Sequence, residues 1–560
     1  LLTARVDMLA EGERAVIERA SVVGRVFWWG AVAELSPEEH RAQVGGWLQS
    51  LVRKELIRPE PSDPMEEDAY RFTHILVRDA AYGGVPKARR AELHERFARW
   101  LEDKSRGRTG EVEEVVGYHL EQAYRTLHEL GAVDAGTRAM GLRAATPLTS
   151  AGRRALARGD MPAAVNLLSR ADALTPTDAP GRTELLPDLA FALLQTGDFG
   201  RMREVLTELE EAASDSGDPI LRAHAALLDL WMRLFTDPEG WAGEASREAT
   251  RAIVTFEEHG DDRGVAQGWA MLGLFHMIKG DFGMAVDAWE AAAGHASTAG
   301  AEREALEHLA WVPVGVWSGP MPVDEAILRC GQILERAQGD RKAMAVALAV
   351  SGNLEAMRGQ FDRARELGAR ARSVLQEIAL PGWEGALTQM SGWAEILADD
   401  PGAAERDLRW GVETLRGIGE LSWLSTTAAF LAEALYSQGR LDEADEYVGV
   451  SQETAGSEDI FSQVLLRTVR AKIEAHRGRP EDAESSAREA VSIAGASDSL
   501  LLQGEALTSL AYVLGFAGRL EEGEAALTDA VRVCEHKGNT AGAARARSLW
   551  EASLERAAGA

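Results

Sequence analysis

A short phrase returns along the chain at a nearly fixed interval. It reads glycine, a polar residue, an aromatic or aliphatic residue, two variable residues and alanine, and it occupies positions 280–285, 359–364 and 439–444. The leading glycines at 359, 439, 478 and 518 are separated by 80, 39 and 40 residues. A fixed period of this length predicts a protein built from stacked structural repeats.

The phrase is interpreted as a tight turn between two helices. Before Gly478, apolar residues with helical spacing (Leu465, Val469 and Ile473) indicate a helix. A glycine after such a run supplies the left-handed residue that ends a helix. Pro480 then suits the first turn of a second helix, where its missing N–H costs nothing. The repeating unit is therefore predicted to be helix, turn and helix.

Turn positions recur at steps close to 40 residues from position 159 to position 518, which predicts about ten hairpins. The turns that depart from the pattern include Gly319-Pro320-Met321-Pro322, which is the most distorted, and Asp400-Pro401-Gly402, which lacks the leading glycine. The chain resembles the tetratricopeptide (TPR) superfamily in this region. We therefore expect residues 138–560 to form a right-handed α-solenoid of TPR-like hairpins, in which each hairpin touches only its neighbours and the stack curves around a concave face.

Residues 1–104 follow a different pattern. The predicted elements are, in order, helices at 9–20 and 37–51, extended segments at 56–58 and 70–72, and a helix at 87–103. The two extended segments flank a loop rich in Pro, Asp and Glu, which predicts a β-hairpin. Helices followed by such a wing indicate a winged-helix domain over residues 1–104, and residues 105–137 are expected to form a connecting helix. The fold class is thus mainly α.

Winged helices often bind DNA, and the last helix of this region carries a basic cluster of Lys87, Arg89, Arg90, Arg96 and Arg99. The predicted wing, however, carries five acidic residues: Glu60, Asp63, Glu66, Glu67 and Asp68. An acidic wing repels the phosphate backbone. The net charge is −29, and the first 150 residues hold 21 basic and 24 acidic side chains, so most of the acidic excess lies in the repeats. Both observations argue against a nucleic-acid partner.

Two stretches of the N-terminal region carry a family resemblance. One is YRFTHILVRDAAY at 70–82, followed by PKARRAELH at 86–94, and the other is ASVVGRVFW at 20–28. Together they resemble the winged-helix region of bacterial STAND signalling ATPases, above all those in which an adenylate/guanylate cyclase domain precedes an AAA-type ATPase and a tetratricopeptide tail. The resemblance is specific over residues 1–175 and becomes general repeat similarity beyond them.

The resemblance implies a nucleotide switch. In such ATPases the winged-helix region closes over bound nucleotide, and a histidine there contacts the phosphates of ADP. His74 stands at the matching place, after a predicted strand and before a helix, and an imidazole can donate to phosphate oxygens. The alternative is a histidine that caps the following helix or packs in the core. In the presumed parent protein, ATP or ADP with Mg would be held by an upstream nucleotide-binding domain.

The chain itself lacks the motif that holds nucleotide phosphates. No Gly-x-x-x-x-Gly-Lys-Ser/Thr occurs in its 560 residues, and without that cradle the β- and γ-phosphates are not held for reaction. Cys-x-x-Cys, His-Glu-x-x-His and Gly-x-Ser-x-Gly are also absent. We therefore expect no catalytic residue, no metal site and no resident cofactor in this chain; the parent protein is expected to be an ATPase or a nucleotide cyclase.

Composition indicates an ordered chain. The hydrophobic content of 46% is typical of globular proteins, and no apolar run approaches the ~20 residues that a membrane-spanning helix needs. Neither does the start resemble a signal peptide. Cys330 and Cys534 are far apart in sequence and are interpreted as reduced thiols, so we expect a cytoplasmic protein. The chain begins at Leu1 in the middle of a predicted helix, which suggests a longer parent.

Tryptophans concentrate in the middle of the repeats. Ten of the fifteen lie between Trp231 and Trp423. Six fall on or near the first helices of their hairpins, which line the concave side in such stacks: Trp231, Trp269, Trp311, Trp383, Trp393 and Trp423. Exposed in a groove, they would anchor a protein partner or a small-molecule effector. The alternative is ordinary packing between hairpins.

Two functions remain open from the sequence. The first is a regulatory or sensor arm of a signal-transduction ATPase, in which the repeat superhelix binds a protein or small ligand and controls a nucleotide switch encoded upstream. The alternative is a non-enzymatic TPR scaffold for protein–protein interaction with a vestigial winged helix. A third, the tail of a LuxR-type transcription activator, would need a C-terminal helix-turn-helix, whereas the chain ends in a single predicted helix over residues 541–557.

Overall fold

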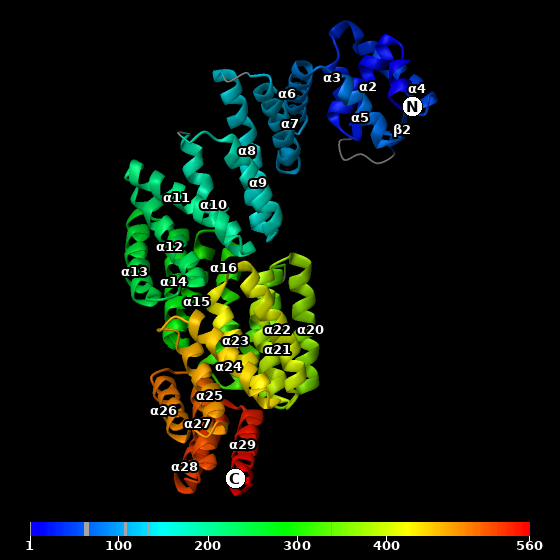
Figure 1. Ribbon diagram of the computed structural model, residues 1–560. Helices are drawn as coiled ribbons and strands as arrows, with labels where there is room; N and C mark the ends of the chain where they lie inside the picture. The colour runs from blue at the N-terminus through cyan, green and yellow to red at the C-terminus, as the bar shows by residue number, and fades with distance from the viewer. Residues whose placement is uncertain are drawn as a thin grey trace. The chain divides into compact units, whose positions relative to one another are not determined.

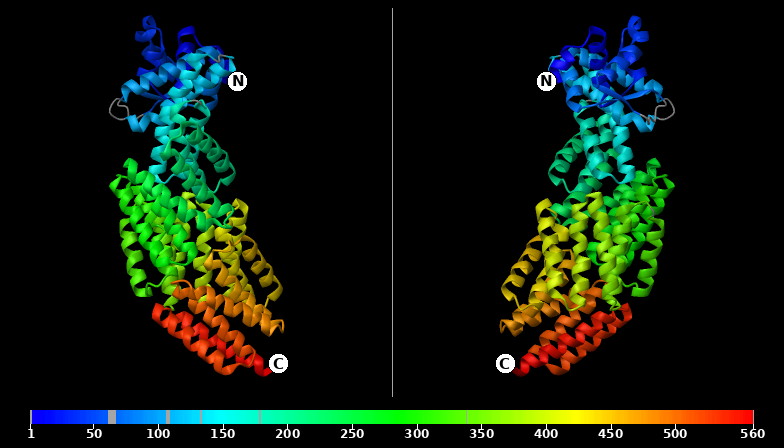
Figure 2. Two further views of the ribbon diagram at one scale, coloured as in Figure 1. Left: turned by 90° about the vertical axis from the view of Figure 1, so that its left-hand side faces the viewer. Right: turned by 90° about the vertical axis from the view of Figure 1, so that its right-hand side faces the viewer.

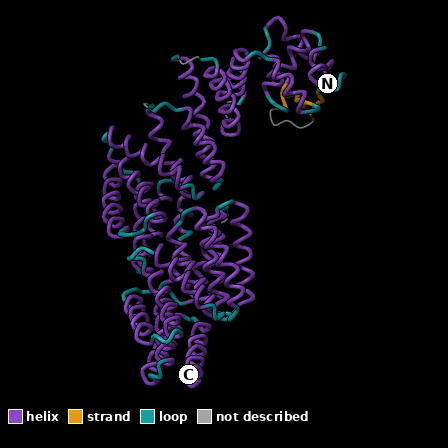
Figure 3. The backbone as a smooth tube through the Cα atoms, in the orientation of Figure 1, coloured by secondary structure: helices purple, strands orange, loops and turns teal. Residues whose placement is uncertain are grey.

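The chain forms two compact units, seen in a computed structural model (Figure 1). The N-terminal unit comprises residues 1–155 and 163–188, and the repeat unit comprises residues 156–162 and 189–560. The structure describes residues 2–60, 67–105, 109–131, 134–177, 179–337 and 339–559. Within these residues, strands occur in the N-terminal unit, and the repeat unit consists of helices and turns (Figure 3).

The N-terminal unit begins with a small mixed fold. Its elements are α1 (Leu2–Asp7), α2 (Glu11–Val23), β1 (Val26–Trp28), α3 (Trp29–Leu35), the 3-10 helix η1 (Glu38–Gln43), α4 (Val44–Arg53), β2 (Ile57–Glu60), β3 (Ala69–Phe72), α5 (Ile75–Gly84) and α6 (Lys87–Lys104). Strands β2 and β3 pair antiparallel, with Ile57 opposite Phe72, so the predicted hairpin is present. Asp63 and Glu66 of the acidic loop lie outside the described residues.

Two features of this unit differ from the sequence prediction. Strand β1 pairs with the free edge of β3 and gives the sheet order β1-β3-β2. The apolar run at 22–27 does not alternate and contains Gly24, so it gives no strand signal. The helix expected at 37–51 is divided into η1 and α4. The helix expected at 87–103 is present as α6, and its Phe97 is fully buried against Trp28 at a ring distance of 6.4 Å.

All later elements are helices. They are α7 (Thr109–Glu129), α8 (Ala135–Arg158), α9 (Met161–Leu174), α10 (Pro180–Thr196), α11 (Phe199–Ser216), α12 (Pro219–Thr236), α13 (Trp241–His259), α14 (Asp262–Lys279), α15 (Phe282–Thr298), α16 (Glu302–Leu309), α17 (Val312–Ser318), α18 (Val323–Arg336), α19 (Arg341–Met357), α20 (Phe361–Ile378), α21 (Pro381–Leu397), α22 (Pro401–Ile418), α23 (Leu421–Ser437), α24 (Leu441–Thr454), α25 (Ile460–His476), α26 (Pro480–Gly495), α27 (Leu500–Phe516), α28 (Leu520–Lys537) and α29 (Thr540–Gly559). From α12 to α28 they pack as successive hairpins (Figure 2).

The turn chemistry of the hairpins matches the prediction. Gly280, Gly359, Gly439, Gly478 and Gly518 all take left-handed backbone conformations, with φ between 71° and 79°. Glycine adopts this region without the steric cost that a Cβ brings. Each of these glycines ends the first helix of its hairpin, so the 40-residue phrase marks the turns of a helical repeat.

The two irregular turns are resolved differently. In the repeat without a leading glycine, Asp399 takes the left-handed position, with φ of 59°; aspartate tolerates this conformation better than most residues because its short side chain can bond locally. Gly319 is instead extended, and the first helix of its hairpin is broken into α16 and α17. Pro313 stands in the first turn of α17, where its lack of an N–H is tolerated.

The repeat unit closes on itself, which corrects the expectation that each hairpin touches only its neighbours. Helix α12 contacts α23, α14 contacts α25, and α17 contacts α27. The amides of Phe282 and Gly283 donate to the Asp498 carboxylate at 2.9 and 2.8 Å, across 216 and 215 residues. The Ser499 hydroxyl donates to the Ser318 carbonyl at 2.6 Å. The superhelix is therefore wound tightly enough for one turn to lie against the next.

This closure explains the character of the first helices. In α23 every residue from Leu424 to Tyr436 is buried, and α19 and α27 are buried on almost all sides. A helix that is apolar around its whole circumference is one surrounded by protein. The first helices thus form the interior of the repeat unit, in place of the wall of an open concave groove.

Lys537 clamps two turns of the superhelix together. Its ammonium donates to the carbonyls of Val316, Gly319 and Met321 at 2.9, 2.7 and 2.7 Å. An ammonium has three N–H donors, so all are used. The side chain is 1% exposed, and burial lowers its pKa to about 7. The irregular turn at 319–322 is therefore the acceptor site for this lysine.

Replacement of Lys537 by methionine is expected to destabilise the repeat unit. Two buried carbonyls and one partly buried carbonyl would lose their donor, at roughly 1–3 kcal/mol per buried unsatisfied group, for a total of at least about 2 kcal/mol. Urea unfolding followed by tryptophan fluorescence measures this, because eleven of the fifteen tryptophans lie in the repeat unit. Arg532→Met, at an exposed position of α28, is the control and should change stability by less than about 0.5 kcal/mol. Equal effects of the two variants would contradict the clamp.

Candidate functional site

Four of the six tryptophans singled out from the sequence meet in one aromatic cluster. Trp231 lies on α12, Trp311 directly precedes α17, Trp383 lies on α21 and Trp423 on α23. Ring centroids are 6.1 Å apart for Trp231 and Trp311, 4.9 Å for Trp311 and Trp383, and 4.9 Å for Trp383 and Trp423. These helices belong to four hairpins, which the closure of the superhelix brings together.

The break between α16 and α17 positions the central ring. Trp311 stands at the break as the N-cap residue of α17 and contacts three further rings of the cluster. Trp289 of α15 also stacks with the Trp311 ring, at a ring distance of 5.7 Å. Trp311 and Trp383 are buried, whereas Trp231 and Trp423 are half-buried. The cluster therefore reaches from the interior towards the surface.

The other two candidate tryptophans lie elsewhere. Trp269 is half-buried on α14, and Trp393 is 1% exposed on α21. Trp393 packs against Phe430 at a ring distance of 5.5 Å, and the Arg545 guanidinium lies 5.6 Å from its ring centre. Trp393 is thus part of interior packing around a buried cation.

An aromatic-walled cavity of about 70 Å³ borders the cluster. It lies between α14, α15, α17, α21, α23 and α25 and is called the inner cavity below. Its aromatic walls are Phe282, Trp311, Trp317, Trp383, Trp423 and Phe461, and its polar walls are Ser318, Gln389, Ser422, Thr426 and Asp459. Met277, Val314, Trp423 and Phe461 are half-buried, so the cavity opens to solvent at these side chains.

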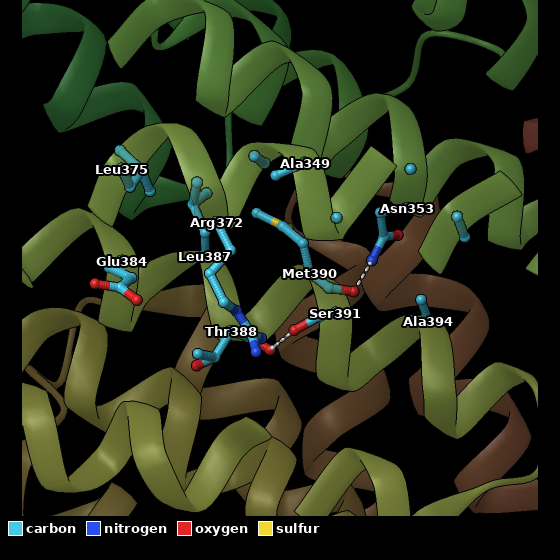
Figure 4. Close-up of a pocket in the computed structure, with 14 residues that line it drawn as sticks. Ala349, Asn353, Arg372, Leu375, Glu384, Leu387, Thr388, Met390, Ser391 and Ala394 are labelled. Atoms are coloured by element: carbon cyan, nitrogen blue, oxygen red, sulfur yellow. Dashed lines mark hydrogen bonds between the residues drawn. The ribbon is translucent and has the colours of Figure 1, made fainter. Parts of the chain in front are cut away.

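A second cavity between α19, α20 and α21 offers less for recognition (Figure 4). Its walls include the small residues Ala349, Gly352 and Ala394. Its polar groups bond to the protein itself, because the Asn353 amide donates to the Met390 carbonyl at 2.7 Å and accepts from the Trp317 indole at 2.7 Å. Figure 4 shows the first of these bonds beside the cavity. This space is a packing gap between helices.

Several buried acids of the repeat unit are paired with buried cations. Lys342 pairs with Glu307, and its Nζ lies 4.6 Å from the Trp383 ring centre. Lys472 pairs with Glu433, and Nζ lies 5.2 Å from the Tyr436 ring centre.

A third buried cation joins this network. Arg545 bonds to Glu433 at 2.5 Å and to Glu505 at 3.1 Å, beneath Trp393. Burial opposes ionisation of Glu307 and Glu433, but the neighbouring cations prevail and hold both pKa values below the usual range.

Two further buried acids have no such partner. Glu420 and Asp459 are the N-cap residues of α23 and α25 and are 2% and 7% exposed. Glu420 accepts from the Trp423 amide at 2.9 Å, and Asp459 accepts from the Ser462 amide at 3.3 Å. No Lys, Arg or His among the described residues forms an ion pair with either carboxylate.

Without a cation, burial dominates the ionisation of these two acids. It raises the pKa of Glu420 to about 8, despite bonds from backbone amides and with a small contribution from Asp459. Burial also raises the pKa of Asp459. Neither acid was predicted as a site residue, although each lies directly before an almost wholly apolar helix, and this pattern is visible in the sequence.

His74 caps the helix that follows it. Its Nδ1 accepts the Leu76 amide of α5 at 3.1 Å, and the side chain is exposed. In a neutral ring the proton therefore lies on Nε2, which has no partner among the described residues. The capping interpretation is thus visible in the structure, and the remaining Nε2–H is free to donate to an anion.

Arg78 and Asp79 have structural partners. They form an ion pair at 3.2 Å, and Arg78 also donates to the Ser21 carbonyl at 2.9 Å. Further along α5, a buried polar chain links three helices: the Tyr82 hydroxyl bonds His94 Nε2 at 2.9 Å, and the two Nδ1 atoms of His94 and His119 are 2.8 Å apart. Burial lowers the pKa of His94 to about 3, so the chain runs through neutral rings.

The basic cluster on α6 is engaged within the N-terminal unit. Lys87 pairs with Glu129 and Arg99 with Glu95, each at 3.0 Å. Arg90 donates to the Val85 carbonyl at 2.8 Å. These side chains therefore support the packing of α6, and they do not form a separate array of free cations.

Among the described residues, no three His, Cys, Asp or Glu side chains gather in a geometry suited to a metal ion. Cys330 and Cys534 are free, buried thiols, and burial raises the pKa of each to about 12. Every helix in the described part of the chain is too short or too polar to span a bilayer.

Comparison with known proteins finds only distant structural similarity. No protein-family model and no curated protein sequence matches the chain. Among solved structures, a Rap protein complexed with competence and sporulation factor has 12% identity and a TM-score of 0.44, covering 69% of this chain and 99% of its own. Yeast Tom70 has 14% identity and a TM-score of 0.33, covering 82% and 96%.

A third similar structure is a Signal Transduction ATPase with Numerous Domains (STAND) protein with a tetratricopeptide repeat sensor from Pyrococcus horikoshii. It has 14% identity and a TM-score of 0.27, and the match covers 98% of this chain and 66% of that protein. Likeness at these scores says nothing of the ligand or activity of this chain. The assignment to a helical-repeat fold depends on its own hairpins and turns.

The raised pKa of Glu420 predicts a pH-dependent stability. Between its ordinary pKa of 4.5 and its folded pKa of about 8, the folded protein holds a proton that the unfolded chain releases. This stabilisation is complete below the ordinary pKa and is lost as pH rises through the folded pKa. Glu420→Gln keeps an oxygen for the cap but cannot ionise, so it should remove roughly 2–3 kcal/mol of the stability loss between pH 5.5 and 8.5.

Urea midpoints at three pH values measure this effect. Glu521→Gln, at an exposed position of α28, is the matched control and should follow the wild-type pH profile. A parallel profile for Glu420→Gln would show that the carboxyl remains ionised in the fold and would contradict the assignment.

Proposed function

We propose that this chain is the regulatory and sensor arm of a signal-transduction ATPase. The observation that carries the proposal is the inner cavity, because its walls come from five hairpins that meet where the superhelix closes. A ligand there contacts all five at once and can favour one winding of the superhelix over another. The arm itself carries no catalytic residue under this proposal, and its cellular location is cytoplasmic.

The N-terminal unit supplies the link to nucleotide in this proposal. Residues 1–104 act as a winged-helix domain, residues 105–137 connect it, and residues 138–560 form the TPR-like solenoid. The order of helices, the β2–β3 hairpin and the third strand β1 support the first assignment. The exposed Nε2–H of His74 would donate to a phosphate oxygen of ADP bound by an upstream nucleotide-binding domain, where ATP or ADP and Mg belong. The output of that parent would be ATP hydrolysis or nucleotide cyclisation.

The alternative function is a non-enzymatic scaffold for a protein partner, with a vestigial winged helix. One observation favours it: His74 already has a structural task, as the cap of α5. The reading frame upstream of Leu1 separates the two proposals. A P-loop there supports the sensor arm, and a complete gene without one overturns it.

In the longer protein, two substitutions at His74 separate capping from phosphate binding. His74→Asn keeps an oxygen that can cap α5 but removes the imidazole donor, whereas His74→Ala removes both. If His74 bonds a phosphate oxygen, both variants should weaken ADP binding by about tenfold to a hundredfold, since a hydrogen bond to a charged group contributes roughly 1.5–3 kcal/mol. Isothermal titration with ADP measures this.

The control for the nucleotide test is His128→Asn, at an exposed position of α7, which should leave ADP affinity unchanged. Weakening by His74→Ala alone would assign His74 to the cap. Unchanged affinity in both His74 variants would refute the phosphate contact.

A further inference from the structure

We propose that the inner cavity binds a small organic ammonium ion. The inference deepens the proposed function, because it takes the inner cavity as the effector site and names the chemistry of the effector. The cavity combines aromatic walls with one buried carboxylate, that of Asp459. No Lys, Arg or His is among its described lining residues.

The repeat unit holds its own buried cations with this same combination. Lys342 lies over the Trp383 ring and against a carboxylate, and Lys472 lies over the Tyr436 ring and against another. Arg545 follows the rule a third time, beneath Trp393. A ring face attracts a cation through its quadrupole, and the attraction grows as water is excluded. Each resident cation is thus held by a ring and an acid together.

The inner cavity has the ring and the acid but lacks the cation. Its six aromatic side chains include Trp423 and Phe461, and Asp459 is 7% exposed at the start of α25. No described cation pairs with Asp459, in contrast to Glu307 and Glu433, which are paired. A ligand that brings a positive charge would complete the arrangement.

The same walls disfavour other ligand classes. An anionic ligand would find a carboxylate and no basic side chain among the described residues of the wall, and burying an unpaired charge is costly. A neutral apolar ligand would gain contact with the rings but would leave Asp459 without a counter-charge. The cavity volume of about 70 Å³ favours a small molecule over a folded partner.

The test compares a cation with its neutral isostere on the full chain. Choline and 3,3-dimethylbutan-1-ol have closely similar shape, but only choline is charged. Titration of each, followed by tryptophan fluorescence and by calorimetry, should show saturable binding of choline and at least about tenfold weaker binding of the alcohol. Trp311, Trp383 and Trp423 report occupation directly, since they line the cavity.

A matched pair of variants assigns the binding to Asp459. Asp459→Asn keeps a good N-cap residue but removes the charge, and it should weaken choline binding about tenfold or more while leaving urea unfolding near wild type. Asp400→Asn makes the same change at the N-cap of the outer helix α22, where Asp400 accepts the Ala403 amide at 2.9 Å. It should bind choline as wild type does.

Each other outcome overturns the ammonium assignment. Equal binding of choline and the alcohol would define a purely apolar pocket, and binding unaffected by Asp459→Asn would place the cation elsewhere. Failure of both probes to bind the folded chain, or capture of a lysine-containing peptide without choline, would remove the small cation as occupant. These results leave the P-loop and ADP tests untouched, so the proposed function can fail or stand separately.

Discussion

Contact between hairpins more than 200 residues apart in sequence is the interaction on which the repeat unit depends. The Asp498 carboxylate accepts hydrogen bonds from two amides at the start of α15, and the Lys537 ammonium donates to three carbonyls at the end of α17. These are fully buried or partly buried polar contacts, whose groups would be costly to leave unpaired. They turn a stack of hairpins into a closed body with a true interior, and the aromatic cluster and the inner cavity lie in that interior.

The closed interior changes the electrostatics of the first helices. In an open solenoid, acids at the N-caps of inner helices would face water. Here Glu420 and Asp459 are covered, so burial raises the pKa of both carboxyl groups, and backbone amides bond to them without a cation. Lys472 and Arg545 show the other solution, in which buried charges of both signs neutralise one another. Within one interior, some buried acids are paired with cations and others are not. The inner cavity belongs to the second kind, since its carboxylate has no cation beside it.

The parts of this architecture that depend on local residues could be predicted from the sequence. The hairpin period and the turns follow from glycine and proline chemistry, which acts over a few residues, and the left-handed Gly478 and Gly518 agree with that reasoning. The closure follows from small rotations accumulated over five or more hairpins, which no single segment encodes. The tryptophans were selected from the sequence, but only closure decides that Trp231 meets Trp311 and that Trp393 does not. At His74 the sequence permits a cap and a phosphate contact together, and the capping bond is the one that local geometry can reveal.

The long-range pairings have a consequence for how such a gene can change. Repeat arrays commonly lengthen or shorten by duplication or loss of whole units, since each unit needs only its neighbours. In this chain Ser457 bonds to Glu239, Asp498 to Phe282, and Lys537 to the segment 316–321, all at separations of 216–221 residues. Deleting one hairpin between the members of these pairs would displace every pair by a whole repeat. The number of hairpins between the paired residues is therefore fixed. Hairpins can be gained or lost freely only outside the closed part of the repeat unit.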